Sequence, residues 1–167
     1  MSIRPIVIAL SIIFGLILQA TLFAELNLFG LGLVPDLILI VVVSYGLLKG
    51  PWYGSILGLA GGLVADLLAG GSIVGVGALA RMATGFLAGL LEKTIFKDNL
   101  LVPFLSLLAG TAVCEAIFLT INSALGWPLG PVLYLIPRVA AISLYNAVLA
   151  PFLYRQFYRL EMRLVTD

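Results

Sequence analysis

Histidine is absent from this chain of 167 residues, and cysteine occurs only once. Histidine is the usual general base at neutral pH and the commonest metal ligand, so its absence excludes Ser-His-Asp triads and histidine-based zinc sites. A single cysteine excludes an internal disulfide. The sequence also has no Gly-rich phosphate loop ending in Lys-Ser or Lys-Thr, no Gly-x-Ser-x-Gly elbow and no metal-ligand spacing. We therefore expect no enzymatic activity and no cofactor.

Charged residues are also scarce, at 10% of the chain, whereas 62% of the residues are hydrophobic. A soluble domain uses roughly a quarter of its residues as Asp, Glu, Lys and Arg to cover its surface. Most of this protein's surface must therefore face lipid. The formal net charge of +1 provides no long-range basic field, so nucleic acid is not an expected partner.

Six long apolar runs are separated by charged or turn residues. A helix that crosses the hydrocarbon core of a bilayer needs about 20 apolar residues, and somewhat fewer where the bilayer thins. The predicted spans cover residues 5–22, 33–48, 52–69, 73–96, 100–125 and 132–154, each with ends uncertain by several residues. The sequence therefore predicts an all-α integral membrane protein with six transmembrane helices in one domain.

The Lys and Arg residues outside the spans predict the orientation. When loops are assigned alternately to the two sides, seven basic residues fall together on one side: Arg4, Lys49, Lys93, Lys97, Arg155, Arg159 and Arg163. The opposite loops, at residues 25–32, 70–72 and 126–130, contain none. By the positive-inside rule, both termini are cytoplasmic. The first run is too long for the apolar region of a signal peptide, so we interpret it as an uncleaved span.

The last three of these arginines repeat every four residues, at Arg155, Arg159 and Arg163. They have two interpretations: a simple positive-inside anchor, or a basic amphipathic extension on the inner membrane surface. Specific lipid recognition is typical of clusters of about four to eight basic residues. The anchor is therefore the simpler interpretation.

Two neighbouring spans carry glycines at four-residue spacing, which keeps them near one helical face. They are Gly54, Gly58 and Gly62 in the third span, and Gly77, Gly85 and Gly89 in the fourth. Asp66 continues the first series and Arg81 interrupts the second. Such faces let helix backbones approach closely, so we expect them to serve helix packing within the protein or the docking of a partner.

Four charged residues lie inside the predicted spans: Asp66, Arg81, Glu115 and Arg138. Counting from the outer end of each span at 1.5 Å per residue places all four in the outer half of the membrane. Leaving any of them unpaired in lipid would cost at least about 2.5 to 3.5 kcal/mol on insertion scales. We therefore expect one network of these four residues, which either lines an outward-facing pocket or partner groove or locks helix register. Asp36, beside Pro35, is more simply a helix N-cap.

The arrangement of these motifs resembles the MreD family of the bacterial rod-shape and cell-wall elongation system. The likeness rests on Val34-Pro35-Asp36-Leu37 at the second span, Lys49-Gly50-Pro51-Trp52-Tyr53-Gly54 at the inner turn, and the glycine series with Asp66 and Arg81. The resemblance implies a six-helix fold similar to the S components of energy-coupling-factor transporters. It also implies association with MreC, and with a wider complex of MreB, RodA and a class B penicillin-binding protein.

Two functions therefore remain in view. The first is a non-enzymatic scaffold that binds MreC and helps regulate peptidoglycan synthesis. The second is a vitamin-binding S component, a class that docks its transport module through small residues on the inner half of the first span. These small residues often form an Ala-x-x-x-Ala pattern. Here Ala20 and Ala24 have this four-residue spacing, but they lie at the outer end of the first span. This placement favours the scaffold, with an ion or lipid transporter as a third possibility.

Overall fold

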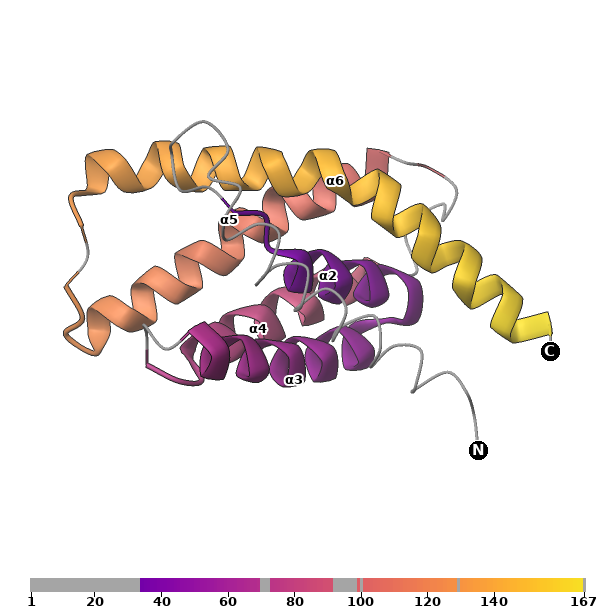
Figure 1. Ribbon diagram of the computed structural model, residues 1–167, viewed down its shortest axis with the longest axis horizontal. Helices are drawn as coiled ribbons and strands as arrows, with labels where there is room; N and C mark the ends of the chain where they lie inside the picture. Colours follow the sequence, from indigo (N-terminus) through magenta and orange to yellow (C-terminus); the bar gives the residue numbers. More distant parts are fainter. Residues whose placement is uncertain (1–33, 70–72, 92–98, 100, 129, 167) are drawn as a thin grey trace.

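A computed structural model of the chain describes residues 34–69, 73–91, 99, 101–128 and 130–166. Within these ranges the protein is all-helical, with helices α2 (Leu37–Lys49), α3 (Pro51–Ala69), α4 (Val76–Leu90), α5 (Leu101–Ala124) and α6 (Val132–Thr166) (Figure 1). The predicted first span, residues 5–22, lies outside the described residues. The end of the predicted fourth span does so too, because residues 92–98 are not described.

Helix α2 occupies the centre of the bundle. Every residue from Leu37 to Leu48 is buried, and the helix contacts α3, α4, α5 and α6. Figure 1 shows it between α6 on one side and α3 and α4 on the other. A helix that is apolar on all sides is stable either in contact with lipid or enclosed by protein, and α2 is enclosed by the other helices. Gly50 then turns the chain with a positive φ of 93°. Pro51 begins α3, where its missing N–H costs no helical hydrogen bond.

Helices α3 and α4 pack through their glycines. A Cβ added to Gly54 would collide with the carbonyl oxygen of Gly85, and one added to Gly58 would lie 2.5 Å from the carbonyl oxygen of Arg81. A Cβ on Gly62 would lie 2.6 Å from the Cα of Ala78. Both predicted glycine faces therefore lie in close backbone contacts inside the bundle: Gly54 meets Gly85, whereas Gly58, Gly62 and Gly89 meet the backbone of Arg81, Ala78 and Pro51. Gly77 is the exception and is described below. Gly46 of α2, which was not among the predicted glycines, joins the same contact: its added Cβ would lie 2.9 Å from the Gly85 oxygen.

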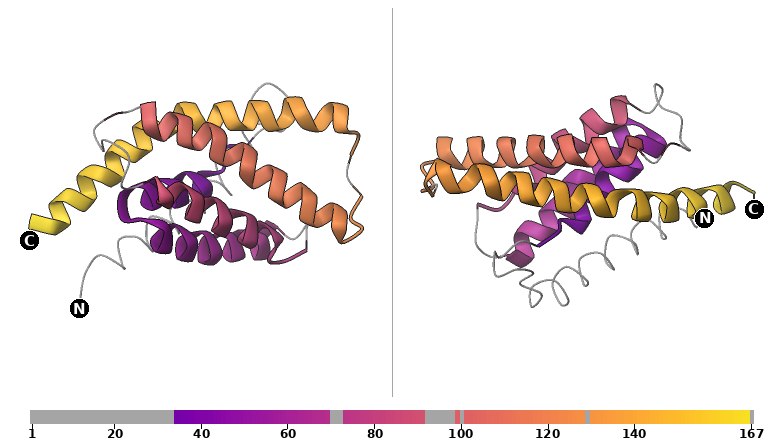
Figure 2. Two further views of the ribbon diagram at one scale, coloured as in Figure 1. Left: turned by 180° about the vertical axis from the view of Figure 1, so that it is seen from behind. Right: turned by 90° about the horizontal axis from the view of Figure 1, so that it is seen from above.

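Helices α5 and α6 pack against each other and cover α2 from the other side (Figure 2). Helix α6 is a single element of 35 residues, so it continues well beyond residue 154, where the predicted sixth span ends. Its later part packs on the end of α2, because the rings of Tyr45 and Phe157 lie 5.5 Å apart and Tyr154 is only 3% exposed. Figure 1 shows that α6 bends along its length, and the helix contains Pro151, a residue that interrupts helical hydrogen bonding.

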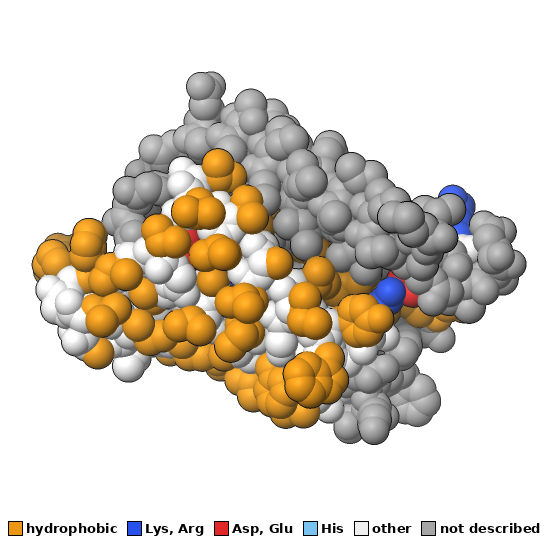
Figure 3. Space-filling model, turned by 90° about the horizontal axis from the view of Figure 1, so that it is seen from below, with side chains coloured by type: hydrophobic (Ala, Val, Ile, Leu, Met, Phe, Trp, Pro, Cys, Tyr) orange, Lys and Arg blue, Asp and Glu red, His pale blue; other side chains and the backbone are white. Residues whose placement is uncertain are grey.

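Three of the described helices contain stretches long and apolar enough to cross a membrane: Pro51–Leu68, Leu101–Ala124 and Leu133–Arg163. Helices α2 and α4 are apolar but shorter, and at 1.5 Å per residue they reach about 20 and about 22 Å of a core roughly 30 Å thick. On the face drawn in Figure 3 the described side chains are almost all hydrophobic, as a lipid-facing surface requires. The structure therefore describes an all-helical membrane protein with three such helices, and six spans stay a prediction.

Candidate charge cluster and cavity

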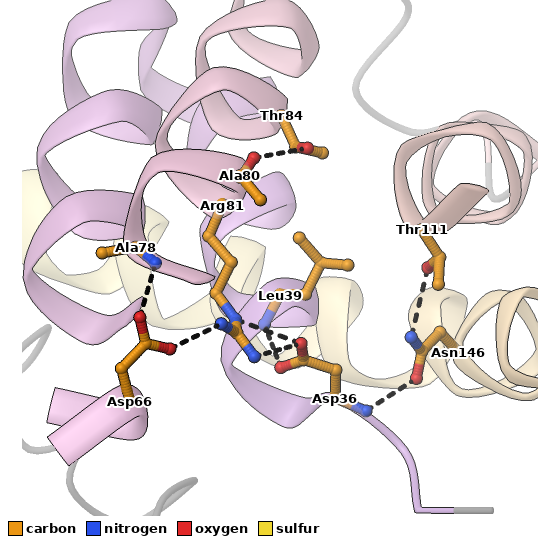
Figure 4. A network of polar contacts seen from close by, with 9 residues as sticks. All are labelled: Asp36, Leu39, Asp66, Ala78, Ala80, Arg81, Thr84, Thr111 and Asn146. Atoms are coloured by element: carbon orange, nitrogen blue, oxygen red, sulfur yellow. Dashed lines mark hydrogen bonds and ion pairs between the residues drawn. The ribbon is translucent and has the colours of Figure 1, made fainter. Parts of the chain in front are cut away.

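Asp36 lies at the start of α2 and has two roles. One carboxylate oxygen, Oδ1, accepts a hydrogen bond from the backbone N–H of Leu39 at 2.9 Å, which caps the helix. The other, Oδ2, accepts hydrogen bonds from Nε and Nη2 of Arg81 at 3.1 and 2.8 Å (Figure 4). Asp36 is thus the N-cap that its sequence context predicts. It is also the nearest acidic partner of Arg81, a role that the sequence did not suggest.

Asp66 caps a helix other than its own. Its Oδ2 accepts hydrogen bonds from the backbone N–H groups of Gly75 and Ala78, at 2.9 and 3.1 Å, at the start of α4. The residue at the N-cap position of α4, Gly75, has no side chain to do this, so a carboxylate from α3 takes its place. The other oxygen of Asp66 lies 3.7 Å from Nη1 of Arg81.

Gly77 makes room for this ion pair. A Cβ at this position would collide with the carboxylate of Asp66 and would lie 2.7 Å from Nη1 of Arg81. Gly77 therefore differs from the other glycines of its series, which face helix backbone. Its lack of a side chain is required by the charge cluster and not by close approach of the two helix backbones.

Arg81, Asp36 and Asp66 form an ion triad that is close to electrically neutral. The three side chains are 15%, 17% and 6% exposed, so water screens them little. Two carboxylates and one guanidinium leave a formal charge of −1, but each carboxylate also caps a helix N-terminus. Each N-terminus carries a partial charge of roughly +0.5, and the two together offset the excess. The triad therefore has no need of a further cation.

A chain of polar contacts ties the triad to the other side of the bundle. The backbone N–H of Asp36 donates to Oδ1 of Asn146 at 2.9 Å, and the Nδ2 of Asn146 donates to Oγ1 of Thr111 at 3.1 Å (Figure 4). Asn146 and Thr111 are buried on α6 and α5. Polar positions of neighbouring helices therefore meet at one level of the structure.

The triad forms one wall of a cavity of about 290 Å³. All four residues of the predicted network line this cavity, together with Asp36 and Cys114. The structure therefore brings Asp66, Arg81, Glu115 and Arg138 together, but it divides them into two sets. Within the described residues, Arg81 forms ion pairs with Asp36 and Asp66, whereas Glu115 and Arg138 take part in no ion pair or hydrogen bond.

Counting depth along the sequence missed Asp36 for a physical reason. The count assumes that each span begins at the membrane surface, which places Asp36 close to that surface. A helix of 13 residues is only about 20 Å long and so shorter than the hydrocarbon core, which means that its Asp36 and Lys49 ends cannot both lie at membrane surfaces. The sequence did contain a signal for the depth of Asp36. The second apolar run is short, so its first residues lie deeper in the membrane, closer to the level of Arg81.

The opposite end of α2 carries the basic residues. Lys49 forms an ion pair with Glu161 of α6 at 2.9 Å and lies 5.2 Å from the ring centre of Tyr53. Arg155, Arg159 and Arg163 are exposed on the same part of α6. This part of α6 is packed on the core through Tyr154, so it is not a separate surface helix. The ion triad and the basic residues therefore lie at opposite ends of α2.

The geometry of the described residues can bind a charged group or lock the helices in register. The described residues include no group of three or more Cys, Asp or Glu side chains that could hold a metal ion. Each carboxylate of the triad is committed to a helix N-terminus and a guanidinium, so neither is available as a general base. What the arrangement provides is a charged cavity in which Glu115 and Arg138 attract each other without a direct ion pair.

Comparisons with known proteins complete the description of the site. No curated protein and no solved structure matches the chain significantly. The family described as rod shape-determining protein MreD matches residues 1–164, which is nearly the whole sequence. That family is a structural, shape-determining membrane family and not a known family of enzymes. A match of this extent, to a chain with the apolar helices and the buried charges described above, shows that the chain belongs to the MreD family.

Proposed function

We propose that this protein is a non-enzymatic scaffold of the cell-wall elongation complex in the bacterial inner membrane, and that it binds MreC. The family match over residues 1–164 carries the proposal. The structure supports it in one respect: the described helices form a compact bundle with a rigid, fully packed centre at α2 and no extended loop that could hold a catalytic domain. A bundle of this kind suits the docking of another transmembrane helix.

The glycine faces are not the docking surface in this proposal. Gly54, Gly58, Gly85 and Gly89 are used in contacts among α2, α3 and α4. A partner helix would have to use an outer face, such as that of α6, where Val148 and Phe152 are 60% and 68% exposed. In this proposal MreB, RodA and the class B penicillin-binding protein join through MreC or at the same bundle, as the family resemblance suggests.

Purification from the native membrane tests this function. The tagged chain is purified after mild crosslinking, and the proteins that accompany it are identified by mass spectrometry. A tagged six-span protein of unrelated family serves as the control. We expect MreC, a single-span protein with a periplasmic region, together with wall-synthesis enzymes, to be enriched on this chain and absent from the control. Equal recovery in both samples would refute the proposal.

A vitamin-binding S component is the second candidate, because the charged cavity is an observation that a scaffold does not require. Its volume of about 290 Å³ falls at the lower edge of the range of roughly 300 to 1,000 Å³ that is usual for ligand sites. An S-component-like fold, which the family resemblance implies, would serve this candidate and the scaffold alike. In the same purification, recovery of a membrane coupling protein with two ATPases would establish the transporter and exclude the scaffold.

A further inference from the structure

On one wall of the cavity the charged side chains are held by ion pairs and hydrogen bonds, and on the other wall they are not. Asp36, Arg81 and Asp66 are fully engaged with each other and with two helix N-termini. Glu115 of α5 and Arg138 of α6 line the same cavity. Arg138 is the charge that acts most strongly on Glu115, but within the part of the chain that the structure describes no N–O distance of 4.0 Å or less joins the two, and neither forms a hydrogen bond. A ligand that enters between them would therefore complement one anion and one cation.

Arg138 is placed to meet an anion from the membrane. It lies six residues after the first residue of α6, about 9 Å along the helix, and its side chain is exposed. Its neighbours Tyr134 and Ile136 are 72% and 66% exposed, as expected of a lipid-facing surface. A guanidinium in this position requires a counter-charge or must reach the head groups. Its planar fork of N–H donors matches the oxygens of a phosphate.

Glu115 requires a ligand group that carries positive charge. It is half-buried on α5, and the side chains of Phe118 and Leu119 border the same cavity. A carboxylate with apolar neighbours is stabilised by a donor that carries positive charge and N–H groups. A primary ammonium has three such N–H donors, whereas a quaternary ammonium has none.

We propose that this cavity binds the phosphoethanolamine head group of a membrane lipid, with the ammonium on Glu115 and the phosphate on Arg138. The apolar rim and the exposed apolar surface beside Arg138 favour a lipid over a free solute, since acyl chains can leave the cavity along that surface. A phosphoglycerol head group would leave Glu115 unpaired, and a choline head group would offer it no N–H donor. The proposal does not depend on the scaffold function, because it concerns purified protein and lipid alone.

The only cysteine provides a reporter inside the site. Cys114 lines the cavity and is 6% exposed. The full chain is purified in detergent and treated with a small methanethiosulfonate reagent, in the presence of short-chain phosphatidylethanolamine, phosphatidylcholine or phosphatidylglycerol. We expect phosphatidylethanolamine to slow the labelling of Cys114 about tenfold more than the other two lipids, the ratio that one lost charge-assisted hydrogen bond produces. Native mass spectrometry of retained lipid gives a second measurement that needs no thiol reaction.

Three variants locate the effect. Glu115→Gln and Arg138→Gln should each remove the preference for phosphatidylethanolamine. Arg155→Gln, an exposed arginine of the same helix outside the cavity, should retain it. Equal binding of the three lipids by the unaltered protein would overturn the proposal even if a variant failed to fold. Protection by free phosphoethanolamine at the same concentration as the lipid would overturn the assignment to a lipid.

Discussion

At the scale of single residues, Asp36 and Asp66 each use one carboxylate oxygen to cap a helix and the other to bind Arg81. The two tasks have different chemical requirements. Capping needs an acceptor oxygen, which asparagine also provides, whereas the ion pair needs a full negative charge. Substitution by asparagine therefore separates the two contributions.

Replacement of Arg81 by methionine should destabilise the protein strongly. The change leaves the carboxylates of Asp36 and Asp66 buried without their common cation, and breaking a buried ion pair in this way costs about 3 to 5 kcal/mol. The free energy of unfolding, measured by titration with SDS in detergent micelles, checks the expectation. An unchanged free energy would mean that the triad contributes no stability.

A second substitution should restore part of the loss. Asp36→Asn keeps the cap on Leu39 and removes one uncompensated charge, so Arg81→Met with Asp36→Asn should be more stable than Arg81→Met alone. The matched control is Arg81→Met with Glu115→Gln, because Glu115 forms no ion pair within the described structure. Equal rescue by both second substitutions would show that net charge matters and that specific pairing does not.

At the scale of helices, the α3–α4 contact depends on backbone touching backbone. Gly58→Ala should lower the free energy of unfolding by about 1 to 3 kcal/mol, because the new methyl group meets the rigid carbonyl of Arg81 and not a flexible side chain. The same SDS titration measures the effect. Gly130→Ala is the control, since a Cβ at Gly130 has no neighbouring atom within 4 Å. A loss at Gly58 cannot come from helix propensity, which favours alanine over glycine, and an unchanged free energy for Gly58→Ala would show that the two helices separate at little cost.

The later part of α6 offers another comparison between neighbouring residues. Tyr154 is 3% exposed and packs in the core, whereas Phe152 is 68% exposed. Tyr154→Ala should cost about 3 kcal/mol through the cavity that it creates, and Phe152→Ala should cost much less. Unfolding measured in micelles, with tryptophan fluorescence as the signal, distinguishes them. Equal losses would indicate that this part of α6 does not pack on the bundle.

The sequence predicted these features unevenly. Charged residues inside apolar runs stand out, so the cluster residues were predicted, and regular glycine spacing identified two helix faces. Pairing was not predictable, because it depends on how deep each helix begins, and the short α2 displaces Asp36. The continuation of α6 beyond residue 154 was only one of two interpretations of the arginine series, because arginines end an apolar run without ending a helix. Gly46 keeps the spacing of Gly50 and Gly54 but belongs to another helix, and its added Cβ would be less crowded than those at Gly54, Gly58 and Gly62.

At the scale of the whole molecule, the two ends of α2 have opposite character. Asp36 belongs to the ion triad, and Lys49 belongs to the end that carries the basic residues of α6. Under the positive-inside rule the Lys49 end faces the cytoplasm. The charged cavity then lies toward the outer side.

This orientation predicts the behaviour of fusion proteins. A fluorescent protein that folds only in the cytoplasm should fluoresce when fused after residue 167, and alkaline phosphatase should be active when inserted between residues 126 and 130. The reciprocal fusions, with phosphatase at the end of the chain and the fluorescent protein in the loop, are the controls and should be inactive. The opposite pattern would show that the bundle is inserted the other way round.

The position of the triad in the sequence also sets an order for biogenesis. Asp36 and Asp66 leave the ribosome before Arg81, which follows them by 45 and 15 residues. Until α4 emerges, the segments of α2 and α3 carry two carboxylates without their cation, and α2 lacks most of the helices that later enclose it. We therefore expect these segments to enter the lipid more readily once the third helix is present. Integration of α2, α3 and α4 together is then favoured over a succession of independent hairpins.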